Sequence, residues 1–150
     1  MGKTESYITV VGETAAEYTE KRSRFIATLK HCKTEEEAAE FINALKSKYW
    51  DARHNCYAYS VENGALKRFS DDGEPHGTAG KPILSVIEGA SITNVCIVVT
   101  RYFGGVLLGT GGLVRAYTKA AADAAAKITK AVMTPGMFFS AECDYSSAER

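Results

Sequence analysis

The sequence has no excess of either charge, no long hydrophobic run and no closely spaced cysteine pair. Eighteen Lys and Arg residues balance eighteen Asp and Glu residues, giving a formal net charge of +0. This balance excludes a globally basic, histone-like binder and an acidic tail protein. The longest apolar run, Val95–Val99, is far too short to span a bilayer, so no membrane partner is expected. Residues 1–20 carry four Glu and no apolar segment typical of a signal peptide, which predicts a cytoplasmic location.

The cysteines offer no metal-binding or disulfide pattern. Cys32, Cys56, Cys96 and Cys143 are widely separated, whereas zinc sites usually draw two ligands from one short segment. Without an export signal, we expect reduced, unpaired thiols, with Cys96 buried in its strand. The sequence therefore predicts no metal and no cofactor.

The composition is that of an ordinary globular domain. Hydrophobic residues make up 45% and charged residues 24% of the 150-residue chain. A chain of this length buries enough surface to fold without disulfides or metal.

Apolar patterns predict five strands in the first 100 residues and one near the end. The ranges are 7–11, 24–30, 55–61, 66–69, 93–100 and 137–143. The alternation in 24–30 predicts one wet face, whereas the unbroken apolar run in 93–100 predicts a central strand covered on both faces. Residues 13–23 are polar and give no strand signal.

Two long helices and one short helix are expected. Thr34 and Glu37 form a capping-box pattern at the start of the first, whose apolar residues recur at helical spacing. Pro82 is expected at the first position of the short helix, which stops at Gly89. The second long helix follows a glycine-rich segment and frays near Met133.

Residues 70–82 form an irregular loop, with three Gly and two Pro in thirteen residues. A Gly-rich acidic loop can bind a divalent cation, but the EF-hand spacing is absent. A rigid turn, in which acidic side chains accept from backbone N–H groups, is the favoured interpretation. His76 could act as a general base, although no nucleophile motif accompanies it. The candidate functional residues of this loop are Asp71, Asp72, Glu74, His76 and Lys81.

The glycines at 104–112 are the second candidate site. They precede a helix, whose free N–H groups and positive dipole end can receive a phosphate. Arg101 and Arg115 flank them, and neither the Walker A nor the GxGxxG pattern is met. The predicted nucleic-acid or anion-binding residues are Arg101, Tyr102, Gly104, Gly105, Gly109, Gly111, Gly112 and Arg115. Alternatively, the glycines form a flexible connection that lets the following helix pack closely, and Arg101 pairs with Asp71 or Asp72. In either case we expect the 70–81 loop and the 101–112 segment to share one surface.

Five separated blocks of sequence, in this order, resemble the YigZ/IMPACT family. They are residues 21–27, 51–59, 67–75, 77–82 and 98–117. The resemblance implies an Impact-type N-terminal domain at 1–133. Residues 134–150 would be a linker and the first strand of a truncated ferredoxin-like domain. The implied fold is an α+β, two-layer sandwich with a mixed sheet and two long helices on one face. It is similar to domain four of elongation factor G and to a small-subunit ribosomal protein.

The resemblance also implies a function in translation. Eukaryotic IMPACT proteins regulate translation during amino-acid starvation, and bacterial members are expected to bind RNA or protein near the ribosome. We therefore expect a non-enzymatic binding module whose partner is RNA, the ribosome or a translation-regulatory protein. Sequence-specific DNA binding is not expected. The alternative is a small phosphotransfer or hydrolytic enzyme that uses the Gly-rich and acidic loops, with its catalytic residues unassigned.

Overall fold

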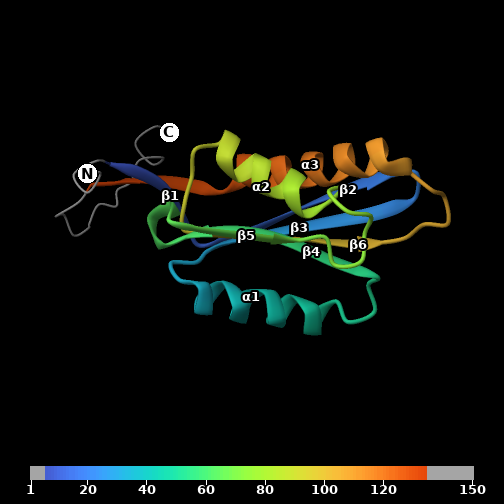
Figure 1. The fold of residues 1–150 in the computed structure, drawn as a ribbon, viewed down its shortest axis with the longest axis horizontal. Helices are drawn as coiled ribbons and strands as arrows, with labels where there is room; N and C mark the ends of the chain where they lie inside the picture. The colour runs from blue at the N-terminus through green and yellow to red at the C-terminus, as the bar shows by residue number, and fades with distance from the viewer. Residues whose placement is uncertain (1–5, 135–150) are drawn as a thin grey trace.

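The computed structural model describes residues 6–134. Seven strands and three α-helices follow one another along this stretch (Figure 1). In chain order they are β1 Tyr7–Val11, β2 Glu13–Glu20, β3 Ser23–His31, α1 Glu35–Lys48, β4 His54–Val61, β5 Leu66–Ser70, α2 Gly80–Gly89, β6 Val95–Tyr102, α3 Gly109–Lys127 and β7 Thr129–Met133. A short 3-10 turn, Glu62–Gly64, joins β4 to β5.

The main sheet has five strands in the order β2-β3-β6-β4-β5. Each neighbouring pair is antiparallel, so the expectation of a mixed sheet is wrong. β1 and β7 form a separate antiparallel pair. The prediction of a central apolar strand is confirmed, because β6 lies in the middle and Val95–Val99 are fully buried.

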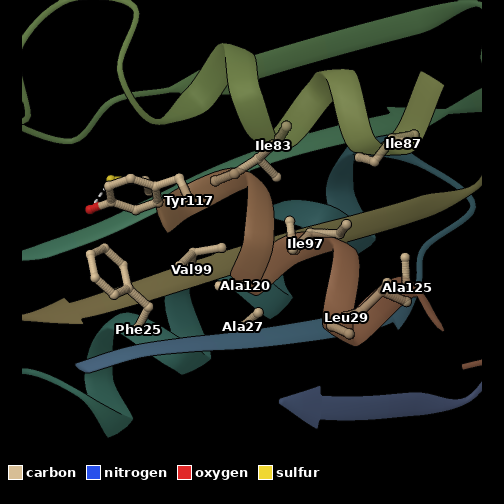
Figure 2. Close-up of a cluster of buried hydrophobic side chains, with 14 of the residues drawn as sticks. Phe25, Ala27, Leu29, Ile83, Ile87, Ile97, Val99, Tyr117, Ala120 and Ala125 are labelled. Atoms are coloured by element: carbon tan, nitrogen blue, oxygen red, sulfur yellow. Dashed lines mark hydrogen bonds between the residues drawn. The ribbon is translucent and has the colours of Figure 1, made fainter. Parts of the chain in front are cut away.

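The helices cover both faces of the main sheet. The α+β class is confirmed, but α1 lies on one face and α2 and α3 on the other, giving three layers rather than two (Figure 1). The alternation of β6 explains this arrangement, since Ile97 and Val99 face α2 and α3, while Cys96 and Val98 face α1. Figure 2 shows the larger core, in which the alanines of α3 bring that helix close to the sheet.

The first helix begins as its capping pattern predicts. The backbone N–H of Glu37 donates to Thr34 Oγ1 at 3.2 Å, and the Glu37 carboxylate accepts from the Lys33 N–H at 2.7 Å. The buried residues of α1 recur on one helical face, as expected: Ala38, Phe41, Ile42 and Leu45. The predicted β4–β5 hairpin is also confirmed.

Four local expectations are wrong. Residues 13–20 form a strand, β2, because Ala16 and Tyr18 pack on the core although their neighbours are polar. β3 is covered on both faces, since the alternate residues Ile26 and Thr28 are also buried. The short helix begins at Gly80, which makes Pro82 its third residue. The second long helix ends at Lys127, and Thr129–Met133 form β7 instead of a frayed end.

Within residues 6–134, no helix is both long and apolar enough to cross a membrane. The strand expected at 137–143 lies outside the described residues.

Candidate functional site

One end of the main sheet gathers four connecting segments, at the right of Figure 1. They are the Lys21–Arg22 turn, residues 49–53 between α1 and β4, the 71–79 loop, and residues 103–108 between β6 and α3. We call this surface the loop end. It contains a cavity of about 420 Å³, lined by Arg53, His54, Glu74, Pro75, Arg101, Phe103, Leu107, Leu108, Gly109, Thr110 and Leu113. The prediction that the acidic loop and the 101–112 segment share a surface is therefore confirmed.

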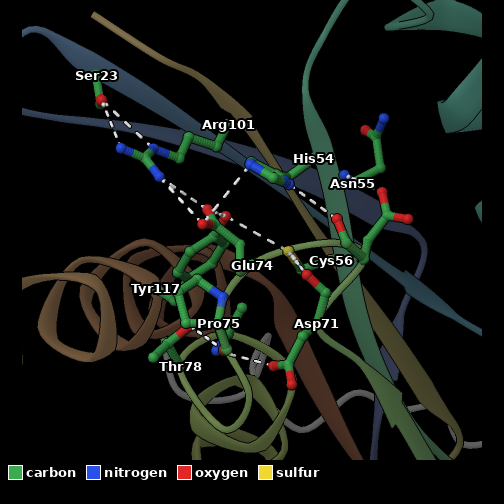
Figure 3. A network of polar contacts seen from close by, with 12 residues as sticks. Ser23, His54, Asn55, Cys56, Asp71, Glu74, Pro75, Thr78, Arg101 and Tyr117 are labelled. Carbon is green, nitrogen blue, oxygen red and sulfur yellow. Dashed lines mark hydrogen bonds and ion pairs between the residues drawn. The ribbon is translucent and has the colours of Figure 1, made fainter. Parts of the chain in front are cut away.

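A buried ion pair forms the floor of this cavity. Nη1 of Arg101 lies 3.0 Å from Oε2 and 3.2 Å from Oε1 of Glu74, and both side chains are almost fully buried (Figure 3). The same guanidinium donates from Nη2 to Ser23 Oγ at 3.2 Å. Arg101 thus pairs with a carboxylate of the acidic loop, but with Glu74 rather than with Asp71 or Asp72.

Two further buried groups complete the network around Glu74. The Tyr117 hydroxyl donates to Glu74 Oε2 at 2.5 Å, and the Cys56 thiol lies 3.4 Å from that hydroxyl and 3.0 Å from the carbonyl of Asp71. Burial raises the pKa of the Tyr117 hydroxyl and of the Cys56 thiol well above their ordinary values. Both groups are therefore neutral at pH 7, and the only buried charges of this network belong to Arg101 and Glu74.

His54 lines the cavity beside this network. Its Nδ1 lies 2.8 Å from the Asp72 carbonyl oxygen, which can only accept, so Nδ1 carries a proton and donates. This leaves Nε2 on the side of Glu74, at 3.6 Å from Oε1. His54 can thus accept a hydrogen bond on the cavity wall, or pair with Glu74 when protonated.

The other acids of the loop serve as acceptors for backbone groups. The Asp71 carboxylate accepts from the N–H groups of Gly77, Ala79 and Gly80 at 2.8–3.1 Å, which caps the start of α2. Burial opposes its ionisation, but these three bonds outweigh burial and hold the pKa of Asp71 below its ordinary value. Asp72 accepts from the Asn55 N–H at 2.7 Å. This geometry is the rigid turn favoured by the sequence, and no group of three potential metal ligands gathers among residues 6–134.

The remaining candidates of the acidic loop lie apart from the cavity. His76 and Lys81 are exposed, and neither lines it.

The glycines of the 104–112 segment have different structural roles. A Cβ at Gly104 would collide with the carbonyl group of Arg22, so the close approach of these two segments requires glycine. Gly105 and Gly109 have positive φ values of +91° and +77°. Gly111 and Gly112 lie in the first turn of α3, whose start has no side-chain cap.

The two arginines predicted to flank a phosphate do not share one cavity. Arg115 is exposed and lines a smaller hollow of about 130 Å³ with Lys21 and Gly112, whereas the buried Arg101 lines the larger cavity. A clamp made by both guanidiniums is therefore not formed. Tyr102 is half-buried, and its hydroxyl donates to Asp51 at 2.8 Å.

The model of the Impact N-terminal domain matches residues 21–125. The chain belongs to this family. The resemblance seen in the sequence is thereby confirmed, and the match covers the main sheet from the start of β3 and most of α3.

Relatives of this Impact N-terminal domain are bacterial and eukaryotic. The chain is 48% identical over 119 residues to IMPACT family member YvyE of Bacillus subtilis, covering 79% of this chain and 55% of that protein. A crystal structure of a hypothetical protein is similar at a TM-score of 0.82 and 39% identity, covering 87% of this chain and 65% of that one. The two-domain translational regulator Yih1 is similar at a TM-score of 0.51 and 28% identity, and the match covers 77% of this chain and 46% of that one. The chain thus spans about half to two-thirds of these proteins.

Several residues of the site in this Impact N-terminal domain escape prediction from sequence. Ser23, His54, Cys56 and Tyr117 come from three separate elements, β3, β4 and α3, and meet only around Glu74 (Figure 3). All four lie in blocks that carry the family resemblance, 21–27, 51–59 and 98–117, which is the one signal available from the sequence. Arg53 and Trp50 precede β4 and give no motif of their own.

Proposed function

We propose that this domain is a translation-associated binding module that contacts RNA phosphates through the loop end. The proposal rests on one observation: several cations of this surface lack an ion-pair partner among residues 6–134, whereas its acids accept hydrogen bonds within the protein. Four exposed cations, Lys21, Arg22, Arg53 and Arg115, form no ion pair with any described residue.

The acids of the same surface are already engaged. Glu20 accepts from the Tyr18 hydroxyl, Asp51 accepts from Tyr102, and Glu74 is buried against Arg101. Glu20 and Asp51 keep their charge in these bonds but form no ion pair with the four cations, so the loop end presents cations that are free to meet a polyanion although the whole chain has a net charge of +0. A polyanion such as RNA is the partner that this surface complements.

The start of α3 adds a second source of positive potential. Its first-turn N–H groups have no side-chain cap, and Gly109 and Thr110 line the cavity. Helix starts of this kind attract phosphates through backbone N–H groups and the helix dipole. Yih1, the two-domain relative, is a translational regulator, which supports a role in translation for the present chain as well.

The hydrogen bonds argue against the phosphotransfer alternative. Asp71 and Asp72 are bonded to backbone N–H groups, and Glu74 is bonded to Arg101 and Tyr117. The carboxylates that would hold magnesium in such an enzyme are thus acceptors within the protein itself.

Salt dependence of RNA binding tests the proposal. We expect the affinity of the 150-residue chain for single-stranded RNA to fall with salt at a log–log slope of about −3 for four phosphate contacts. Replacing Lys21, Arg22 and Arg53 by alanine should flatten that slope by about 2 units. The measurement is fluorescence anisotropy of a labelled oligonucleotide between about 50 and 200 mM salt.

A matched variant controls for total charge. Replacing Lys67, Arg68 and Lys119 removes the same charge from residues that are ion-paired and lie on β5 and α3. This variant should bind RNA like the parent chain. Equal weakening in both triple variants, or no binding by the parent, would reject RNA contact at the loop end.

A further inference from the structure

The only tryptophan of the chain, Trp50, is also the most exposed aromatic side chain among residues 6–134. Its side chain is 80% exposed, compared with 43% for Phe69 and 37% for Phe103. A tryptophan usually contributes to folding by burying 150–250 Å² of surface, as an approximate range. Trp50 makes almost none of this contribution, so packing within the described domain does not explain it.

The backbone that carries Trp50 is held firmly. Tyr49 caps the end of α1, and its carbonyl oxygen accepts from the Ala52 N–H at 3.0 Å, closing a turn in which Trp50 is the first central residue. The residues on either side of Trp50 both contact Tyr102. The ring centres of Tyr49 and Tyr102 are 6.3 Å apart, and Asp51 accepts a hydrogen bond from the Tyr102 hydroxyl. An ordered turn therefore presents a free indole.

Cations surround this turn. The Arg53 guanidinium lies 5.3 Å from the centre of the Phe103 ring, and the Arg24 guanidinium, which also pairs with Glu17, lies 5.4 Å from that of Tyr102. The Lys48 ammonium lies 5.3 Å from the ring of Tyr49. An exposed indole within a set of cations matches the chemistry of an unpaired nucleotide, which offers a flat base and a phosphate.

We infer that Trp50 stacks on an unpaired RNA base, and that the loop end binds single-stranded in preference to double-stranded RNA. This inference rests on the proposed function and adds to it the form of the RNA. In a duplex, each base is stacked and paired within the helix, so its face is closed to an indole. A strand with free bases can place one on Trp50 while its phosphates meet Arg53 and the neighbouring cations.

The single tryptophan makes the test direct. Titrating the chain with a uridine oligomer of about 12 nucleotides should quench the fluorescence of Trp50, since a stacked base quenches an indole. Replacing Trp50 by alanine should weaken binding of this oligomer about 5- to 150-fold, the range that corresponds to one base stacked on an aromatic side chain. Trp50→Phe should recover most of the affinity, because a phenyl ring also stacks.

Two controls separate stacking from other effects. Val11 is 54% exposed and lies on β1, outside the loop end, so Val11→Ala removes exposed apolar surface away from the proposed site and should leave affinity unchanged. A duplex of about 12 base pairs should leave the fluorescence of Trp50 unchanged and should bind Trp50→Ala and parent chains equally. Circular dichroism should show that the variants are folded, as expected for exposed positions.

The outcomes also separate this inference from the proposal on which it rests. If the oligomer binds with steep salt dependence but leaves the fluorescence unchanged and the Trp50→Ala affinity intact, stacking is overturned while RNA binding stands. If the duplex binds as well as the single strand, the preference is overturned. If neither RNA binds, both proposals fail, and a protein partner becomes the occupant to seek on the exposed indole.

Discussion

Arg101 and Glu74 meet inside the protein, with Nη1 of the arginine 3.0 Å from Oε2 of the carboxylate, and they join the end of β6 to the acidic loop. Both side chains are more than nine-tenths buried. Removing one member of such a pair leaves the other charge buried without a partner, which usually destabilises a protein strongly.

We predict a strong thermodynamic coupling between these two residues. Arg101→Met and Glu74→Leu should each lower the free energy of unfolding by about 3–5 kcal/mol. The loss of unfolding free energy in the double variant should be clearly smaller than the sum of the two single losses, because the double variant leaves no unpaired buried charge. Urea unfolding of the four proteins measures this cycle. Additive losses would show that the pair is not coupled.

The Tyr117 hydroxyl should stabilise the buried carboxylate. Tyr117→Phe removes its hydrogen bond to Glu74 but leaves the edge-to-face contact of the ring with Phe25, whose centre lies 5.1 Å away. We expect a loss of about 1.5–3 kcal/mol, since the acceptor is charged and buried. The same substitution at half-buried Tyr102, whose hydroxyl bonds exposed Asp51, should cost less than about 1 kcal/mol. Equal losses in urea unfolding would contradict this ranking.

Asp71 should stabilise the domain at neutral pH and lose this effect in acid. Its carboxylate caps α2, so Asp71→Ala should cost about 2 kcal/mol, whereas Asp123→Asn in an exposed ion pair should change stability by less than about 0.5 kcal/mol. The pKa of Asp71 is lowered in the folded state, so its contribution is present above the ordinary value of 3.8 and disappears as the pH falls below it. The difference in unfolding free energy between parent and Asp71→Ala chains should be constant from pH 7 to about pH 5 and should narrow as the pH falls below 3.8. A difference that does not narrow in acid would exclude ionised Asp71 as its cause.

Buried thiols should make the fold sensitive to alkali. Burial raises the pKa of Cys32 to about 12 from an ordinary 9.0, so its neutral thiol stabilises the fold below pH 9. That contribution is lost as the pH rises from 9 towards 12. Cys32→Ala should therefore show a shallower fall of unfolding free energy above pH 9 than the parent chain. Parallel curves would exclude Cys32 as a source of this sensitivity.

Thiol labelling gives a second measurement of the same cysteines. Cys96 is fully buried in β6, as predicted, and Cys32 and Cys56 are buried and unpaired as well. At pH 8, without denaturant, these three residues should react far more slowly than in the unfolded chain. Rapid labelling of Cys96 would contradict the central position of β6.

Elements with a strong apolar pattern are predictable from this sequence, and the others depend on tertiary packing. The capping pattern at Thr34 and the apolar run of β6 each have a local physical cause, and both predictions are confirmed. β2 lacks such a pattern, because Ala16 and Tyr18 become core residues only when α3 covers them. Helices lie on both faces of the sheet because successive residues of β4 and β6 are apolar on both sides, which leaves neither face exposed to solvent.

The geometry of the candidate site is harder to predict, because it depends on which carboxylate of the acidic loop is left to pair with Arg101. The alternative that paired Arg101 with Asp71 or Asp72 identified the loop but not the residue. Both aspartates turn towards backbone N–H groups, which leaves Glu74 to enter the core. His54, Cys56 and Tyr117 are distant from Glu74 in sequence, so no spacing rule could connect them. The anion-binding roles of the glycines and of Arg115 stay predictions.

The pairing of β1 with β7 brings the two ends of the described domain to one place. Tyr7 lies opposite Met133, and the hydroxyls of Ser6 and Thr134 are 3.4 Å apart. The chain therefore enters and leaves the described domain at adjacent points. This geometry allows a domain to be inserted into a surface loop of another protein. A force that separates Ser6 from Thr134 would act across the ladder at its open end. It would unzip one residue pair after another, instead of shearing all five pairs of the ladder together.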